Sequence, residues 1–73
     1  MSSLYQRQLE QARASDLSNK PFLSDVEGAV YLSLGKTAFR EFAQRIGCRK
    51  RIGGRVVNDR AVIDDALRRG KAL

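Results

Sequence analysis

The sequence contains no histidine and a single cysteine, and these shortages exclude whole classes of site. Zinc sites of the usual kinds draw their ligands from several Cys and His residues, and a disulfide within the chain needs two cysteines. The lone Cys48 fits a reducing cytoplasm. No base motif stands beside Ser33 or Cys48, and we expect Asp64 and Asp65 to be solvated on a helix. We therefore predict no enzyme activity, no cofactor and no metal.

Long hydrophobic runs are also missing. No segment approaches the roughly 20 apolar residues of a membrane span, and no signal-peptide pattern opens the chain. The 73 residues are enough for one small domain, without room for the cleft of an enzyme or a small-molecule substrate. The only proline, Pro21, closes a polar stretch that we interpret as a linker. This predicts a flexible or partly helical N-terminal arm and linker over residues 1–20 and a folded domain over residues 21–73.

Positive charge is concentrated in one third of the chain. The net charge is +6, and residues 36–60 carry eight Lys or Arg against two acidic residues. A localised basic surface suits a polyanion such as nucleic acid. The alternative is a solvated face that only keeps the protein soluble. The charge surrounds a turn instead of being spread evenly, which favours nucleic acid.

Two helices joined by about three residues are predicted in the middle of the chain. Ser24 with Glu27 matches a capping box at the start of the first helix. The second helix, residues 36–46, has a wide apolar stripe, and Gly47 is expected to end it in a left-handed conformation. Gly28 weakens the first helix by about 1 kcal/mol relative to alanine, unless a small residue there lets another helix approach closely.

A β-hairpin is predicted around the pair Gly53-Gly54, because glycine supplies the positive φ angles of a two-residue turn. In that register Ile52 lies opposite Arg55, and Arg51 lies opposite Val56. A hairpin of two strands is not stable alone in water. We therefore expect Ile52 and one of the two following valines to pack on the helices, with the arginines pointing outward.

A last helix is expected after Asp59 or Asn58, either of which can cap it. The order helix, helix, hairpin, helix predicts an α+β, mainly α, fold. More specifically, it predicts a minimal winged helix with a helix-turn-helix, a two-stranded β-hairpin wing and a C-terminal helix. One shared core is expected from eight residues: Val26, Leu32, Leu34, Phe39, Phe42, Ile52, Ile63 and Leu67.

Two stretches resemble a known family. YLSLGKTAFREF, which starts at Tyr31, is similar to the turn and second helix of the excisionase family of small winged-helix DNA-binding proteins, which are related to the DNA-binding module of the MerR regulators. RIGGRVVNDRAVIDDAL, which starts at Arg51, is similar to the family's wing and the start of its last helix. Asn58 stands where the family usually has an apolar or aromatic residue, and Gly28 where alanine is usual. The resemblance implies DNA binding in the cytoplasm without cofactors.

The helix-turn-helix prediction assigns candidate DNA contacts to two elements. The second helix enters the major groove, where Arg40 could bind guanine and Gln44 adenine, while Glu41 could pair with Arg45 or accept from cytosine. The predicted recognition-helix residues are Lys36, Thr37, Arg40, Glu41, Gln44 and Arg45. The predicted wing residues, which would meet phosphates, are Arg49, Lys50, Arg51, Gly53, Gly54 and Arg55. Lys36 could equally be a solvated lysine.

Two classes of function remain open. The first is sequence-specific binding of double-stranded DNA, either as an excisionase that works with a tyrosine integrase of a mobile element or prophage, or as a small transcriptional regulator. A chain this small offers few contacts, so further copies on adjacent sites or a partner protein would add specificity. The second class is a protein-interaction adaptor or antitoxin-like subunit, for which the apolar stripe of Leu4, Tyr5 and Leu9 would form the contact.

Overall fold

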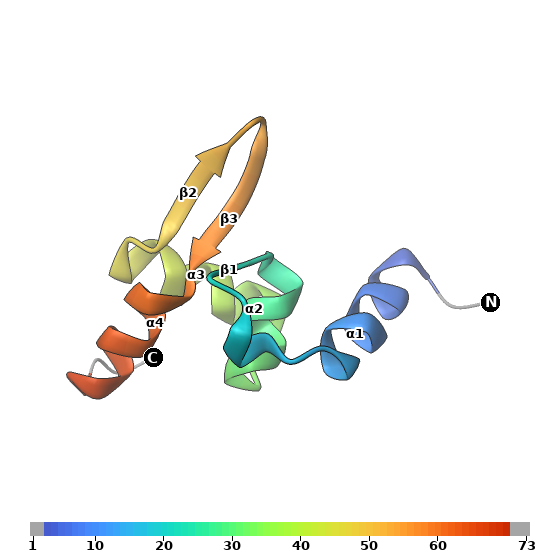
Figure 1. Ribbon diagram of the computed structural model, residues 1–73, viewed down its shortest axis with the longest axis horizontal. Helices are drawn as coiled ribbons and strands as arrows, with labels where there is room; N and C mark the ends of the chain where they lie inside the picture. The colour runs from blue at the N-terminus through green and yellow to red at the C-terminus, as the bar shows by residue number, and fades with distance from the viewer. Residues whose placement is uncertain (1–2, 71–73) are drawn as a thin grey trace.

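The computed structural model describes residues 3–70, and its elements follow the predicted order with additions at the N-terminal end (Figure 1). The elements are helix α1 (Leu4–Ala14), a 3-10 turn (Leu17–Asn19), strand β1 (Phe22–Leu23), helices α2 (Asp25–Leu32) and α3 (Lys36–Ile46), strands β2 (Arg49–Ile52) and β3 (Arg55–Asp59), and helix α4 (Arg60–Arg68). The fold is α+β and mainly helical, with one three-stranded antiparallel sheet in the order β1-β3-β2.

Helix α1 packs against α2 at one end of the molecule (Figure 1). Its first turn is closed by a capping box between Ser3 and Gln6. Ala12 is buried in its second half, and Leu17, in the 3-10 turn, belongs to the core. The division into an arm of residues 1–20 and a domain of residues 21–73 stays a prediction. Residues 1–2 and 71–73 of those ranges lie outside the described part of the chain.

The predicted helix ends are confirmed. The Ser24 hydroxyl accepts from the backbone N–H of Glu27, whose carboxylate accepts in turn from the Ser24 N–H. Gly47 ends α3 with φ of 73°, in the left-handed region. Asp59, the first of the two suggested caps, accepts from the backbone N–H of Ala61 at the start of α4. No helix within residues 3–70 combines the length and the apolar character needed to cross a membrane.

The hairpin of β2 and β3 forms in the predicted register and projects from the helices (Figure 1). Ile52 pairs with Arg55 and Arg51 with Val56, and both turn glycines have positive φ. The third strand was not predicted: β1 pairs only with the last two residues of β3. Two residues of strand give too short a pattern to be recognised in a sequence. The outer half of the hairpin therefore stands as a two-stranded ribbon.

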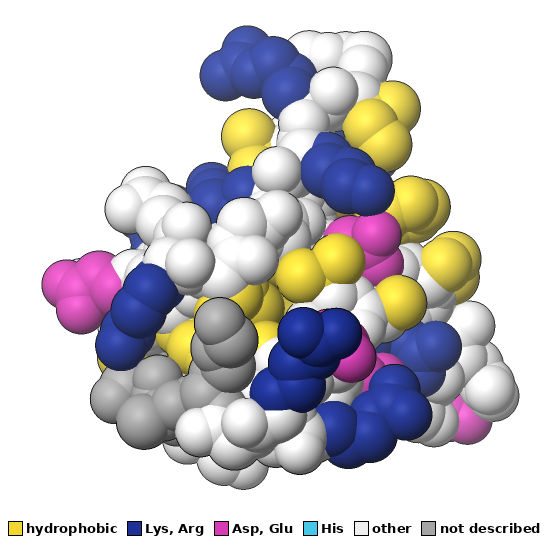
Figure 2. Space-filling model, turned by 90° about the vertical axis from the view of Figure 1, so that its left-hand side faces the viewer, with side chains coloured by type: hydrophobic (Ala, Val, Ile, Leu, Met, Phe, Trp, Pro, Cys, Tyr) yellow, Lys and Arg dark blue, Asp and Glu magenta, His cyan; other side chains and the backbone are white. Residues whose placement is uncertain are grey.

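Two of the eight predicted core residues are wrong. Ile52 is 53% exposed and Leu67 is 43% exposed. Side chains alternate between the two faces of a strand, and the register places Ile52 on the face opposite to the buried Leu23. Hydrophobic side chains accordingly reach the surface of the projecting hairpin (Figure 2). In α4 the core position belongs to Ala66, and Leu67 faces outward.

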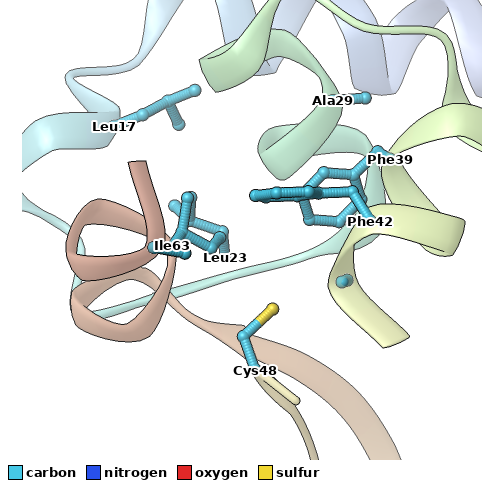
Figure 3. Close-up of a cluster of buried hydrophobic side chains, with 9 residues drawn as sticks. Leu17, Leu23, Ala29, Phe39, Phe42, Cys48 and Ile63 are labelled. Carbon is cyan, nitrogen blue, oxygen red and sulfur yellow. The ribbon is translucent and has the colours of Figure 1, made fainter. Parts of the chain in front are cut away.

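The core lies between the helices and the base of the sheet (Figure 3). Phe39, Phe42, Val26 and Ile63 are buried as predicted, and Leu32 and Leu34 are half-buried against them. The buried cluster consists of Leu17, Leu23, Ala29, Phe39, Phe42, Ala43, Cys48, Ile63 and Ala66. Cys48 is fully buried there, and this burial raises the pKa of its thiol, as suits a packing residue and not a nucleophile.

Helix α4 is joined to α2 by a hydrogen bond that the sequence did not predict. The Tyr31 hydroxyl donates to Asp64 at 2.7 Å, and the pKa of Tyr31 is raised by this bond. Asp64 is therefore not a purely solvated acid. Its neighbour Asp65 is exposed and pairs with Arg69 at 3.0 Å on the outer side of α4.

Candidate nucleic-acid interface

The polar face of α3 is open to solvent along its length. The helix buries Phe39, Phe42 and Ala43 and turns the opposite side outward. Its exposed polar residues are Thr37, Arg40, Glu41, Gln44 and Arg45, and Lys36 is half-buried at the start. This side therefore carries all the residues that were predicted for the recognition helix. The pairing of Glu41 with Arg45 stays a prediction.

Lys36 has a partner that the sequence did not indicate. Its Nζ lies over the ring of Tyr5 in α1, 5.4 Å from the centroid. An ammonium group over an aromatic face is attracted by the ring quadrupole. The contact places α1 beside the first turn of α3, so the N-terminal helix forms part of the surroundings of the predicted recognition helix.

The four cations of the hairpin fall into two groups. Arg51 and Arg55, next to the turn, are exposed, and neither has a carboxylate partner within residues 3–70. Arg49 and Lys50, nearer the helices, are paired with Asp25 and Asp59 respectively. Figure 2 shows Lys and Arg side chains on the projecting hairpin. Among the described residues, the positive charge of the predicted wing that has no carboxylate partner therefore lies at its tip, around Gly53 and Gly54.

Asp25, the first residue of α2, connects three other elements. Its carboxylate accepts from Arg40 Nε of α3 at 3.1 Å and from Arg49 Nη1 of β2 at 2.9 Å. Asn58 Nδ2 of β3 donates to it at 3.0 Å. Sequence reasoning missed this residue, because its partners lie 15 to 33 positions away along the chain. The structure therefore brings the recognition helix and the base of the hairpin together through one carboxylate.

The environment of Asp25 keeps it ionised. Burial would raise its pKa, but hydrogen bonds from Asn58, Arg49 and Arg40 outweigh burial and hold the pKa below its ordinary value. Asn58 is fully buried and also donates to the backbone carbonyl of Leu23 at 3.1 Å. The amide can satisfy two acceptors at once because it carries two donors.

Two further carboxyl groups near the interface are held in the charged form. Burial opposes the charge of Glu27, but the bonds from Lys20 and Ser24 prevail and lower its pKa. The hydrogen bond from Lys50 is the main cause that lowers the pKa of Asp59. All three acids therefore favour the folded state more strongly when they are ionised.

We expect the free energy of unfolding to fall as the pH is lowered through about 4, where unfolded Asp and Glu titrate. A carboxyl whose folded pKa is depressed contributes stability that is present above its unfolded pKa and lost as the pH falls through its folded pKa. Urea unfolding at a series of pH values measures this. Asp59→Asn is the matched variant, because asparagine caps a helix about as well as aspartate. Its stability should depend less steeply on acid pH, and an unchanged slope would contradict the role given to Asp59.

One groove joins the candidate elements. It has a volume of about 790 Å³ and lies between α1, the first turns of α2 and α3, and β3. Lys36, Arg40 and Arg55 all line it, so the start of α3 and the tip of the hairpin share one concave surface. Glu41 and Gln44 lie outside the groove lining, farther along the exposed side of α3.

No family model, curated protein or solved structure matches this chain.

Proposed function

We propose that this protein binds double-stranded DNA in a sequence-specific manner as a winged helix of the excisionase type. In this proposal α3 enters the major groove and the hairpin of β2 and β3 is the wing. The observation that carries the proposal is that Arg51 and Arg55, which have no carboxylate partner among the described residues, lie on a projecting ribbon that shares a groove with Lys36 and Arg40. A small transcriptional regulator with the same mode of binding is the alternative within this class.

The tip of the hairpin has the shape and charge that a phosphate backbone requires. Gly53 and Gly54 present no side chains, so the turn can approach a backbone or a narrow minor groove closely. Arg51 and Arg55 point to opposite faces of the ribbon, because Arg55 pairs with Ile52 and so shares its face, while Arg51, next to Ile52, lies on the other face. A hairpin inserted in a groove could then contact the phosphates on both sides of that groove, one arginine on each side.

We expect affinity for duplex DNA to be strongly salt-dependent. If about five phosphates are neutralised, log K should fall against log salt with a slope of roughly −4 to −5. Arg51→Ala with Arg55→Ala removes two of these contacts and should make the slope shallower by about 2, with a similar loss for all sequences. Fluorescence anisotropy of a labelled duplex at several salt concentrations measures both quantities.

The control for that experiment has the same net charge. Arg68→Ala with Arg69→Ala also removes two positive charges, but from the end of α4, away from the hairpin. It should leave the slope close to that of the wild type. A flat salt profile in the wild type, or an equal effect of the two double variants, would overturn the assignment of the wing.

The adaptor hypothesis is favoured by one observation. Leu4 is 70% exposed and Tyr5 is 39% exposed on α1, which leaves an apolar strip for a protein partner. The salt titration separates the two classes. An adaptor that binds proteins through α1 is not expected to bind duplex DNA through Arg51 and Arg55. The anisotropy of the labelled duplex would then be the same with and without these two arginines.

A further inference from the structure

We propose that Asp25 is a positioning residue that orients Arg40 for reading guanine, an inference that rests on the proposed DNA binding. Asp25 makes no DNA contact itself in this proposal. It holds the inner side of the Arg40 guanidinium, so that the outer end faces the major groove. The sequence gives no sign of this role, which follows from how the two arginines around Asp25 use their donors.

Arg40 and Arg49 bind the same carboxylate in different ways. Arg49 commits both terminal nitrogens: Nη1 lies 2.9 Å from Oδ1 and Nη2 lies 3.4 Å from Oδ2. Arg40 uses only Nε, 3.1 Å from Oδ2. The terminal nitrogens of Arg40 have no hydrogen-bond partner within residues 3–70, and its side chain is 50% exposed.

The free end of Arg40 matches the edge of guanine. In the major groove guanine offers two adjacent acceptors, O6 and N7, and an arginine reads them with two parallel N–H donors. When Asp25 holds Nε, the two terminal nitrogens remain for this end-on contact. Arg49 has no equivalent pair left, so it serves to fix the base of the wing against α2. Two arginines that look alike in the sequence therefore have different roles: Arg40 can contact a base of the DNA, and Arg49 holds the hairpin against α2.

Asp25 improves specificity in this proposal because it holds the Arg40 side chain in its binding conformation before DNA arrives. A free arginine side chain has many rotamers, and ordering it on binding costs conformational entropy. Asp25 is only 16% exposed and is itself held by the buried amide of Asn58, so the direction of its carboxylate is fixed. The negative charge also repels nearby phosphates. Asp25 should therefore weaken binding to any sequence slightly while it sharpens the preference for guanine.

The test begins with selection of a preferred duplex from a random library by the wild-type protein. Base substitutions in that duplex then identify the guanine that depends on Arg40, by comparison with Arg40→Ala. The wild type should prefer this guanine by about 5- to 150-fold. In Asp25→Asn the preference should fall to within about threefold of that in Arg40→Ala, while affinity for unrelated duplexes stays equal or rises.

Two controls separate positioning from a structural effect. Asp65→Asn makes the same change of charge on α4, where its partner is Arg69, and should keep the guanine preference. In an Arg40→Ala background, Asp25→Asn should not lower the guanine preference further, since Asp25 acts only through Arg40. Circular dichroism establishes that each variant is folded.

If Asp25→Asn does not fold, Asp25→Glu tests the same point. Glutamate keeps the charge, but its carboxylate lies one methylene farther from the backbone, so it cannot hold Arg40 Nε in the same geometry. It should lose most of the guanine preference and keep the salt slope. A folded Asp25→Asn or Asp25→Glu with the wild-type preference would overturn the role of Asp25 and leave DNA binding intact. A wild type that binds no duplex would overturn both proposals.

Discussion

Gly28→Ala should destabilise the protein, although alanine is the better helix former. A Cβ at residue 28 would lie 2.2 Å from Cζ of Phe39, and 2.5 and 2.7 Å from the two neighbouring ring atoms. The ring cannot move aside easily, because Phe39 is fully buried in the core. Overpacking of this kind costs typically about 1–3 kcal/mol or more, against a gain of about 1 kcal/mol in helix propensity.

The expected net loss is large for a domain of this size. A contact of 2.2 Å puts the overpacking cost at the upper end of this range, so the net loss is about 1–2 kcal/mol. Each kcal/mol lowers the melting temperature of a 60–100-residue domain by about 4–8 °C, so we expect a fall of roughly 4–16 °C. Thermal unfolding followed by circular dichroism measures it. Gly35→Ala is the control, because nothing lies within 4 Å of the place that its Cβ would take and its φ is −69°. Gly35 is the N-cap of α3, so this control should lose only the roughly 0.5–1 kcal/mol by which glycine exceeds alanine there. An increase in stability of Gly28→Ala would show that α2 and α3 do not approach each other as closely as Gly28 and Phe39 require.

The helix boundaries and the hairpin could be predicted because short local signals determine them. A capping box needs only Ser24 and Glu27, and a two-residue hairpin turn needs only Gly53-Gly54. Gly28 shows the limit of such signals. The sequence was consistent with a glycine that merely weakens the helix and with a glycine that allows a close contact. Only the position of Phe39 shows that the second is correct.

It was harder to predict which face of each element is buried than where each element begins and ends. Ile52 was expected in the core because a bare hairpin is unstable in water. In the structure the base of the hairpin is anchored by β1 and by the buried Asn58, and Ile52 lies beyond this anchor. The two residues of β1 give no recognisable strand pattern. The local sequence around Ile52 therefore could not show that the support lies elsewhere.

The polar contacts at the centre of the candidate interface could not be predicted, because they join residues far apart in the chain. Asp25 and Asn58 are 33 positions apart. The local sequence around each residue predicts only the helix or strand to which that residue belongs. Asn58 donates to both Asp25 and the Leu23 carbonyl, and an apolar side chain at this position could not satisfy either acceptor.

Asn58→Asp should remove most of the stability of the protein at neutral pH, although the two side chains have nearly the same shape. The introduced carboxylate has no donor for the Leu23 carbonyl or for Asp25, and it puts a second negative charge beside Asp25 in a site with no exposure to solvent. Each buried group left unsatisfied costs about 1–3 kcal/mol, and a charged group costs more. A domain of this size has a total stability of only about 4–11 kcal/mol.

The dependence on pH distinguishes charge repulsion from the loss of hydrogen bonds. The introduced carboxyl has its pKa raised by burial and by Asp25, so the variant should approach the wild type as the pH falls below about 4 and lose stability as the pH rises. Asn58→Leu loses the same donors without adding a charge, and its deficit at higher pH should be smaller. Urea unfolding of the three proteins across this range decides the point. A deficit of Asn58→Asp that stays constant with pH would mean that Asp25 and residue 58 do not meet in the folded protein.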